Sequence, residues 1–170
     1  CCVTRISLAT HTGTHVDAEA HVIHGGKRLG DYPLTAFSGL ARVADLRGLS
    51  VVDASALDSI ESCDWLLLCT GQSEKWGSEE YFGTEPLFTE AFVKAAARIA
   101  RKGIGLDCSG LDREGVALHC VWFSSGGGLM VENLTDLEML LSESQILFAA
   151  YPLKLAAGDG APVRAVAVLG

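Results

Sequence analysis

The chain has 170 residues, of which 49% are hydrophobic and 20% are charged, and its formal net charge is -8 at pH 7. A chain of this length and apolar content can bury one substantial core, so we expect a single domain over residues 1–170. The negative balance disfavours a nucleic-acid groove or an anionic membrane surface. The apolar runs are far shorter than the roughly 20 residues that span a bilayer. We therefore expect a cytoplasmic protein whose partner is a small molecule.

The cysteines are scattered rather than paired. They lie at positions 1, 2, 63, 69, 108 and 120, and no two of them form a CxxC motif. This spacing is typical of reduced thiols, most of them buried as small apolar side chains, and it disfavours a secreted disulfide scaffold. Nothing near Cys108 or Cys120 indicates a lowered thiol pKa, so we expect no cysteine nucleophile.

Short apolar segments bounded by Gly, Pro, Asp or Ser predict buried strands. These segments cover residues 39–45, 65–70, 104–107, 129–132, 145–151 and 163–169. Between them, Thr89 is expected to cap a helix that contains Phe92 and has Arg101 and Lys102 in its last turn, with Gly103 just beyond its end. Strands and helices alternate, which predicts the α/β class with a mixed β-sheet flanked by helices.

Weaker helical signals occur in three places. Asp53 is expected to begin a helix that runs to residue 60, and a segment over residues 113–123 carries His119. Thr135, with Glu138 three residues later, resembles a capping box.

The connection over residues 72–86 is long and carries three aromatic residues, Trp76, Tyr81 and Phe82. Connections of this length between regular elements are often functional. We expect this one either to form part of the wall of a substrate pocket or to pack against a partner subunit.

The densest polar feature of the sequence is a cluster of histidines and carboxylates near the N-terminus. Four of the five histidines fall within fourteen residues, with two acidic residues between them: His11, His15, Asp17, Glu19, His21 and His24. In an extended segment residues 11, 15, 17 and 21 would leave the same face, and Gly13 would open a gap there. Imidazoles and a carboxylate suit zinc, manganese or iron(II). The pattern predicts a metal site, with His24 outside it.

The residues alone leave three functions open. A metal ion that activates water would make the protein a hydrolase. A single iron held by His11, His15 and Asp17 would make it a mononuclear non-haem iron enzyme. A non-catalytic binding protein would keep the fold without turnover. A serine hydrolase is disfavoured because no GxSxG motif surrounds any serine.

The stretch His11-Thr-Gly-Thr-His15-Val-Asp17-Ala-Glu-Ala-His21 resembles the signature HxGTHxDxPxH of the cyclase family of metal-dependent hydrolases. That family includes bacterial kynurenine formamidase and isatin hydrolase. Further blocks resemble it in the same order, so the resemblance covers nearly all of the chain. These blocks are residues 33–39, 70–71, 104–112, 119, 131–134, 152–154 and 159–164.

The resemblance implies hydrolysis of the C–N bond of a small amide or lactam, such as an aryl formamide or an isatin-like compound. It implies two divalent ions per chain, zinc or alternatively manganese, with Asp17 as their bridge. The implied ligands are His11, His15, Asp17, His119 and Glu132. His21 matches the family's catalytic base. The implied fold is a swivelling β/β/α domain, assembled as a homodimer or homotetramer.

The sequence departs from the family pattern in three places. Glu19 stands where the signature has proline. Only ten residues precede His11, so we expect the family's N-terminal segment to be missing from this chain. The glycine triplet at 126–128 makes the connection between His119 and Glu132 one residue longer than usual, which puts the second metal site in question.

Overall fold

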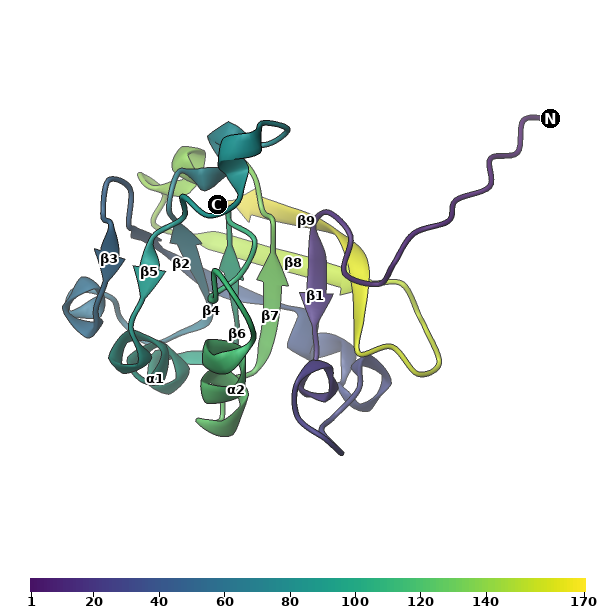
Figure 1. Ribbon diagram of the computed structural model, residues 1–170, viewed down its shortest axis with the longest axis horizontal. Coiled ribbons are helices and arrows are strands. Elements are labelled where there is room, and N and C mark those ends of the chain that lie inside the picture. The colour runs from purple at the N-terminus through teal and green to yellow at the C-terminus, as the bar shows by residue number, and fades with distance from the viewer.

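The computed structural model describes residues 1–170, and its main feature is a mixed sheet of seven strands that closes into a barrel (Figure 1). Around the barrel the order is β1-β7-β6-β4-β2-β8-β9, with β9 returning to pair with β1. The seven strands are β1 His15–Asp17, β2 Ser38–Asp45, β4 Cys63–Cys69, β6 Ala100–Leu106, β7 Leu129–Glu132, β8 Ile146–Pro152 and β9 Gly160–Leu169. The mixed α/β class expected from the sequence is confirmed, whereas the swivelling β/β/α arrangement stays a prediction.

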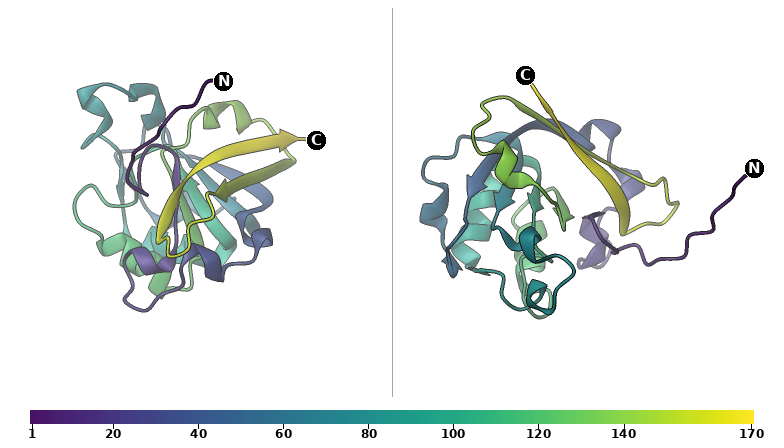
Figure 2. Two further views of the ribbon diagram at one scale, coloured as in Figure 1. Left: turned by 90° about the vertical axis from the view of Figure 1, so that its right-hand side faces the viewer. Right: turned by 90° about the horizontal axis from the view of Figure 1, so that it is seen from above.

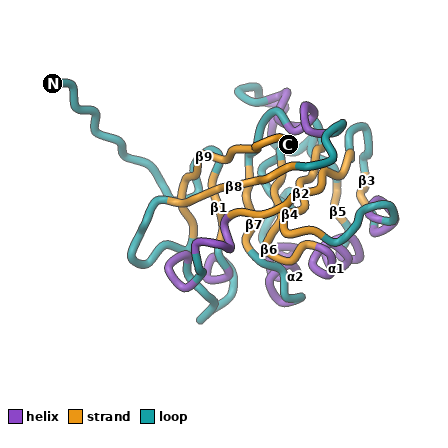
Figure 3. Tube along the Cα trace, turned by 180° about the vertical axis from the view of Figure 1, so that it is seen from behind, coloured by secondary structure: helices purple, strands orange, loops and turns teal.

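Strand directions divide the barrel into two parts. The neighbours β2, β4, β6 and β7 are parallel, whereas β1, β8 and β9 join antiparallel. Figure 3 shows the same strands from behind. A separate parallel pair consists of β3 Val51–Val52 and β5 Leu87–Phe88. The α-helices are α1 Glu90–Ile99 and α2 Ala117–Ser124. The 3-10 turns are Glu19–His21, Leu29–Asp31, Leu34–Phe37, Ala54–Leu57, Gln72–Lys75, Glu79–Tyr81 and Leu137–Leu140.

The two faces of β4 build two separate cores, because side chains alternate along a strand. Leu66 and Leu68 belong to the core that includes residues of α1 and α2. Trp65 and Leu67 belong to the other core, inside the barrel. Gly103 on β6 makes room for the larger of them, since a Cβ there would lie 2.7 Å from the Trp65 ring. Both helices therefore cover one face of the central strands, on the side opposite the barrel interior.

Helix α1 begins as expected but ends earlier. The Thr89 hydroxyl accepts a hydrogen bond from the Phe92 N–H at 3.1 Å, as an N-cap should. The prediction that Arg101 and Lys102 form its last turn is wrong, because β6 starts at once after Ile99. Their side chains instead pair with Asp64 on the neighbouring strand β4, at 3.0 Å and 3.4 Å.

The weaker helical predictions are largely wrong. Asp53 caps no backbone N–H, its carboxylate accepts a hydrogen bond from the Thr89 hydroxyl at 2.7 Å, and only one 3-10 turn follows. Thr135 also caps nothing; the residue before the next element is Asp136, in a left-handed conformation (φ 61°), and that element is a 3-10 turn. The expected helix with His119 exists as α2, beginning at residue 117.

The N-terminal residues 1–10 contain no regular element and extend away from the barrel (Figures 1 and 2). No helix in the structure has the length and apolar character needed to cross a membrane. All six cysteines are free thiols, and Cys63, Cys69 and Cys108 are buried, as expected.

Candidate metal centre

Strand β1 places two of the expected ligands on one face of the barrel. It is only three residues long, yet it pairs with β7 on one side and with β9 on the other. His15 and Asp17 point to one face and Val16 to the other, where it enters the barrel core. His15 lies opposite Glu132 in the register of β1 and β7. Antiparallel pairing thus brings a histidine and a carboxylate 117 positions apart into contact.

His11 and His21 reach the same place by turns rather than by extended backbone. Gly13 has φ +64°, and the bend around it brings His11 Nδ1 to 2.7 Å from Asp17 Oδ1. His21 lies on the 3-10 turn after β1, and its ring centre is 4.0 Å from that of His11. The prediction of one extended face therefore holds only for His15 and Asp17. His24 is exposed in a turn, as expected.

The ligands expected far along the chain also converge here. His119 comes from α2 and Glu132 from the end of β7, with His119 Nε2 2.9 Å from Glu132 Oε1. The other oxygen of Glu132 lies 3.4 Å from His15 Nε2. The glycine triplet between them does not separate the two, because it turns the chain tightly at Gly126 (φ +82°) and packs it against Trp122.

Asp17 is the centre of the cluster, and its environment suits a cation. Its side chain is 1% exposed, and neither carboxylate oxygen has a hydrogen-bond partner. His11 Nδ1 is close to it but is likewise without a hydrogen-bond partner. Two groups of side chains have atoms within 4.8 Å of one another, His11 with Asp17 and His21, and His15 with Asp17 and Glu132. Asp17 is common to both, as a bridging carboxylate would be.

The charges of the cluster also indicate a cation site. Burial raises the pKa of Asp17, but the close approach of His11 and His15 outweighs it and holds that pKa well below its usual range. The same contacts raise the pKa of both histidines against the opposing effect of burial. The buried carboxylate thus needs neighbouring positive charge. A divalent cation would supply that charge and release the imidazole protons.

A carboxylate lies beside each of two further histidines, His119 and His21. Asp112 Oδ2 lies 2.7 Å from His119 Nδ1, and the same carboxylate accepts the backbone N–H of Leu118 at the start of α2. Burial lowers the pKa of His119, but hydrogen bonds to Asp112 and Glu132 raise it overall to about 10. On the other side, Asp159 in the loop between β8 and β9 lies 3.5 Å from His21 Nδ1. The sequence alone gave no role to Asp159.

His15 is positioned through a chain of hydrogen bonds that the sequence did not reveal. Its Nδ1 bonds the Gly13 carbonyl at 2.8 Å, which leaves Nε2 for a metal ion. The Asn133 side-chain amide donates to the same carbonyl at 3.1 Å, and the Tyr81 hydroxyl donates to Asn133 Oδ1 at 2.6 Å. Asn133 adopts a left-handed backbone conformation (φ 56°), and its side-chain amide reaches the bend at Gly13. Tyr81 thereby connects the 72–86 segment to a candidate ligand.

A cavity of about 250 Å³ opens onto the cluster. Two exposed aromatic side chains, Trp76 and Phe82, form one wall of it. Its full lining is His11, Gly13, His15, His21, Trp76, Phe82, Ser109, Glu132 and Asn133. Two of the three aromatic residues of the 72–86 segment therefore line a pocket, whereas Tyr81 is buried and does not, and packing of the segment against a partner stays a prediction. Glu19 is absent from the lining, and its carboxylate accepts the Lys27 N–H at 3.2 Å.

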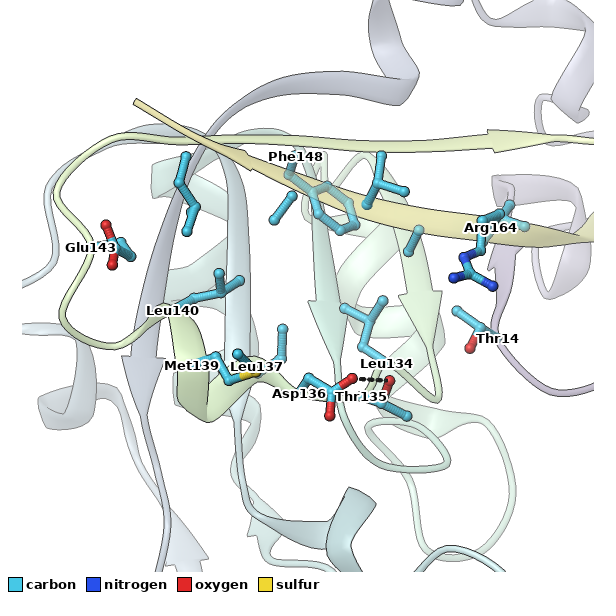
Figure 4. Close-up of a pocket in the computed structure, with 15 residues that line it drawn as sticks. Thr14, Leu134, Thr135, Asp136, Leu137, Met139, Leu140, Glu143, Phe148 and Arg164 are labelled. Atoms are coloured by element: carbon cyan, nitrogen blue, oxygen red, sulfur yellow. Dashed lines mark hydrogen bonds between the residues drawn. The ribbon is translucent and has the colours of Figure 1, made fainter.

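A larger cavity, of about 620 Å³, lies elsewhere, between the Leu137–Leu140 turn and the strands β8 and β9 (Figure 4). Ten of its fifteen lining residues are hydrophobic. Its charged residues are Asp136, Glu143 and Arg164, and no histidine reaches it. The ligand chemistry is therefore confined to the smaller cavity.

A mixed barrel with a buried cluster of imidazoles and carboxylates beside a small cavity defines a candidate metal-dependent α/β enzyme. Residues 3–113 match the cyclase family, and the chain belongs to that family. The expectation from the HxGTHxD stretch is thus confirmed.

Three similar proteins illustrate the relationship. A kynurenine formamidase from Bacillus mycoides is 30% identical over 172 residues, which cover 96% of this chain and 78% of that protein. A solved structure described as a potential metal-dependent hydrolase with cyclase activity has 29% identity and a TM-score of 0.79, covering 95% of this chain and 80% of that one. Isatin hydrolase A from Labrenzia aggregata has the same fold, with 24% identity, a TM-score of 0.79, and coverage of 96% and 75%. The chain is thus a member of a family of hydrolases.

Proposed function

We propose that this protein hydrolyses the C–N bond of a small aryl amide, either an aryl formamide or an isatin-like lactam, with two divalent ions at the centre described above. The observation that carries the proposal is the buried Asp17 carboxylate, whose two oxygens have no hydrogen-bond partner and lie among imidazoles. The kynurenine formamidase and isatin hydrolase relatives support the substrate class.

The donor set fits zinc, with manganese as the alternative. The proposed ligands are His11, His15, Asp17, His119 and Glu132. An ion bound there would lower the pKa of a coordinated water from 15.7 to about 7 and would polarise the substrate carbonyl. The protein's own contribution is to bury the charged ligands and to hold the imidazoles in position through Asp112 and the Gly13 carbonyl.

His21 is the proposed general base. Its ring lines the cavity, its side chain is 28% exposed, and the centres of the His21 and His119 rings are 6.2 Å apart. An imidazole in this place can take a proton from the attacking water and return it to the leaving nitrogen. Asp159 lies beside His21 Nδ1 and can orient the ring so that Nε2 faces the reacting atoms.

The size and walls of the cavity limit the substrate. At about 250 Å³ it is slightly smaller than the usual range of about 300–1,000 Å³ for small-molecule sites. One aromatic ring with a short acyl group fits such a volume. Trp76 and Phe82 offer faces and edges against which an aryl ring can pack. This favours aryl amides over peptides.

The experiment that tests the proposal compares His21→Ala with His24→Ala. After loading with zinc or manganese, hydrolysis of N-formylkynurenine, formanilide and isatin is measured, and bound ions are counted by elemental analysis. His21→Ala should lower kcat by about 10²–10⁴ while two ions per chain remain. His24→Ala is the matched control, because His24 is exposed in the next turn, and it should behave like the unmutated protein.

Two results would favour the other functions. One redox-active iron per chain together with oxygen consumption would indicate a non-haem iron enzyme. Two bound ions without turnover of any tested amide, lactam or ester would indicate a binding protein. The homodimer or homotetramer and the cytoplasmic location stay predictions, which size-exclusion chromatography and cell fractionation can test.

A further inference from the structure

Glu85 is a buried acid that the proposed mechanism does not use. It is 2% exposed, and its Oε2 atom has no hydrogen-bond partner. None of the ion pairs in the structure includes it. A buried carboxylate without a paired cation is unfavourable. The fold nevertheless holds this one at the end of the 72–86 segment.

The backbone of Glu85 is fixed by a second element. The Arg113 guanidinium donates two hydrogen bonds to the Glu85 carbonyl, one of them from Nε at 2.8 Å. Arg113 follows Asp112, which holds the start of α2 and the ring of His119. The position of the Glu85 side chain is therefore tied to the same loop that positions a proposed metal ligand.

The Glu85 carboxylate has one partner, and that partner faces the substrate cavity. Glu85 Oε1 accepts a hydrogen bond from the Ser109 hydroxyl at 3.2 Å, and Ser109 lines the 250 Å³ cavity. The next residue, Gly110, lies against the metal centre, since a Cβ there would be 2.6 Å from Glu132 Oε1. Ser109 is thus next to the place where an amide would react.

The direction of this hydrogen bond decides what Ser109 can offer. A serine hydroxyl has one hydrogen to donate and two lone pairs that accept. Because the hydrogen points at Glu85, only lone pairs face the cavity. An N–H group of a ligand can bond to them, whereas an ether-type ester oxygen at the same position would face another acceptor and leave it unpaired.

We propose that Ser109, positioned by Glu85, accepts a hydrogen bond from the N–H group of the substrate and thereby selects amides and lactams over esters of the same shape. This inference rests on the proposed function and adds to it a specificity residue, Ser109, and a positioning residue, Glu85. An ester is disfavoured in two ways: it cannot donate a hydrogen bond to Ser109, and its oxygen lone pairs face the lone pairs of the Ser109 hydroxyl.

The test uses two aryl substrates that differ only at the bond to be cleaved. The kcat/KM values for formanilide, which has the N–H, and phenyl formate, which has oxygen there, are measured with the metal-loaded protein and corrected for spontaneous hydrolysis. Ser109→Ala removes the acceptor, and the amide-to-ester ratio should fall roughly 3- to 10-fold. Glu85→Gln should lower the ratio by a similar factor, because its amide can donate to Ser109 and turn the hydroxyl hydrogen toward the cavity.

Glu80→Gln is the matched control, since Glu80 is exposed in the same segment, and its ratio should equal that of the unmutated protein. Thermal unfolding checks that each variant is folded. A purely structural role would lower both activities in parallel. A ratio within twofold of the unmutated value in folded Ser109→Ala would overturn the proposal, whatever Glu85→Gln does.

If the unmutated protein turns over neither substrate, the proposed function fails, and binding then decides the role of Ser109. Trp76 is the exposed tryptophan at the cavity, so fluorescence titration with acetanilide and with phenyl acetate reports occupancy. The unmutated protein should prefer acetanilide, and Ser109→Ala should lose most of that preference. An unchanged preference in the variant would overturn the inference.

Discussion

Two cavities of this protein differ in size and in chemistry, and the smaller one carries histidines of the candidate metal centre. The cavity beside β8 and β9 holds about 620 Å³ and is mostly apolar, whereas the one beside β1 holds about 250 Å³ and has two hydrophobic lining residues out of nine. Only the smaller one is lined by a side chain with an unpaired buried polar atom, His11 Nδ1, and His11 contacts Asp17, whose two carboxylate oxygens are also unpaired. Cavity volume therefore does not mark the candidate site. Unpaired buried charge is the better indicator of chemistry.

The largest expected effect comes from Asp17→Asn, which tests this contrast directly. The substitution keeps the shape but removes the negative charge shared by both proposed ions. We expect both ions to be lost and kcat/KM for formanilide to fall by about a thousandfold or more. Elemental analysis and steady-state kinetics measure this.

Asp136→Asn is the matched control in the larger cavity. It should leave the number of bound ions unchanged and should change kcat/KM for formanilide by no more than about twofold. Retention of two ions by Asp17→Asn would contradict the bridging role of Asp17.

A smaller effect is expected from Asp112→Asn. The amide oxygen can still accept the Leu118 N–H, but it no longer provides a charge for His119. Metal affinity should weaken by about 10- to 100-fold, the usual range for partners of metal ligands. Isothermal titration with zinc measures it. Asp53→Asn is the control, because Asp53 also accepts a side-chain hydrogen bond but lies far from the cluster in an exposed position. Equal affinities for the two variants would rule out the positioning role of Asp112.

Tyr81→Phe should have a still smaller effect. It removes the hydrogen bond to Asn133 Oδ1 while leaving the buried ring in place. Loss of one such bond costs about 0.5–1.5 kcal/mol, so metal affinity or kcat/KM should fall roughly 2- to 13-fold. Competition for zinc with a chelating dye is sensitive enough to detect this. A fall of a thousandfold would show that Tyr81 acts on the substrate itself rather than through Asn133 and Gly13.

The smallest effect is expected from Met139→Ala at the larger cavity. Met139 is 70% exposed, and it takes no part in the metal cluster. The free energy of unfolding should change by no more than about 0.5 kcal/mol, and formanilide hydrolysis should be unchanged. Urea denaturation and kinetics check both. A clear loss of activity would mean that the larger cavity contributes to function, and the contrast between the two cavities would then fail.

The sequence predicted the long strands well and the short elements poorly. The unbroken apolar run from Trp65 to Cys69 has one plausible structure, a strand covered on both faces, and that is β4. The three residues of β1 and the two of β3 carry too little periodicity to stand out, since their pairing depends on distant strands. Arg101 was misplaced for the same reason, because its partner Asp64 is 37 residues away.

The candidate site shows the same limit. His11, His15, Asp17 and His21 were predictable because they lie close together in the sequence and share ligand chemistry. His119 and Glu132 entered only through the family resemblance. Asn133 and Asp159 were missed, because their contacts with Gly13 and His11 join residues 120 and 148 positions apart, and no local pattern of residue types marks them.

The brevity of β1 has a consequence for how the protein matures. The three residues of β1 pair with β7 and β9 along their whole length, and a slip by one position would turn Val16 outward and bury both proposed ligands, His15 and Asp17, in the apolar interior. The proposed metal centre would therefore form only when β1 pairs in the correct register. A cation that binds only the correctly paired strands would stabilise that register and no other.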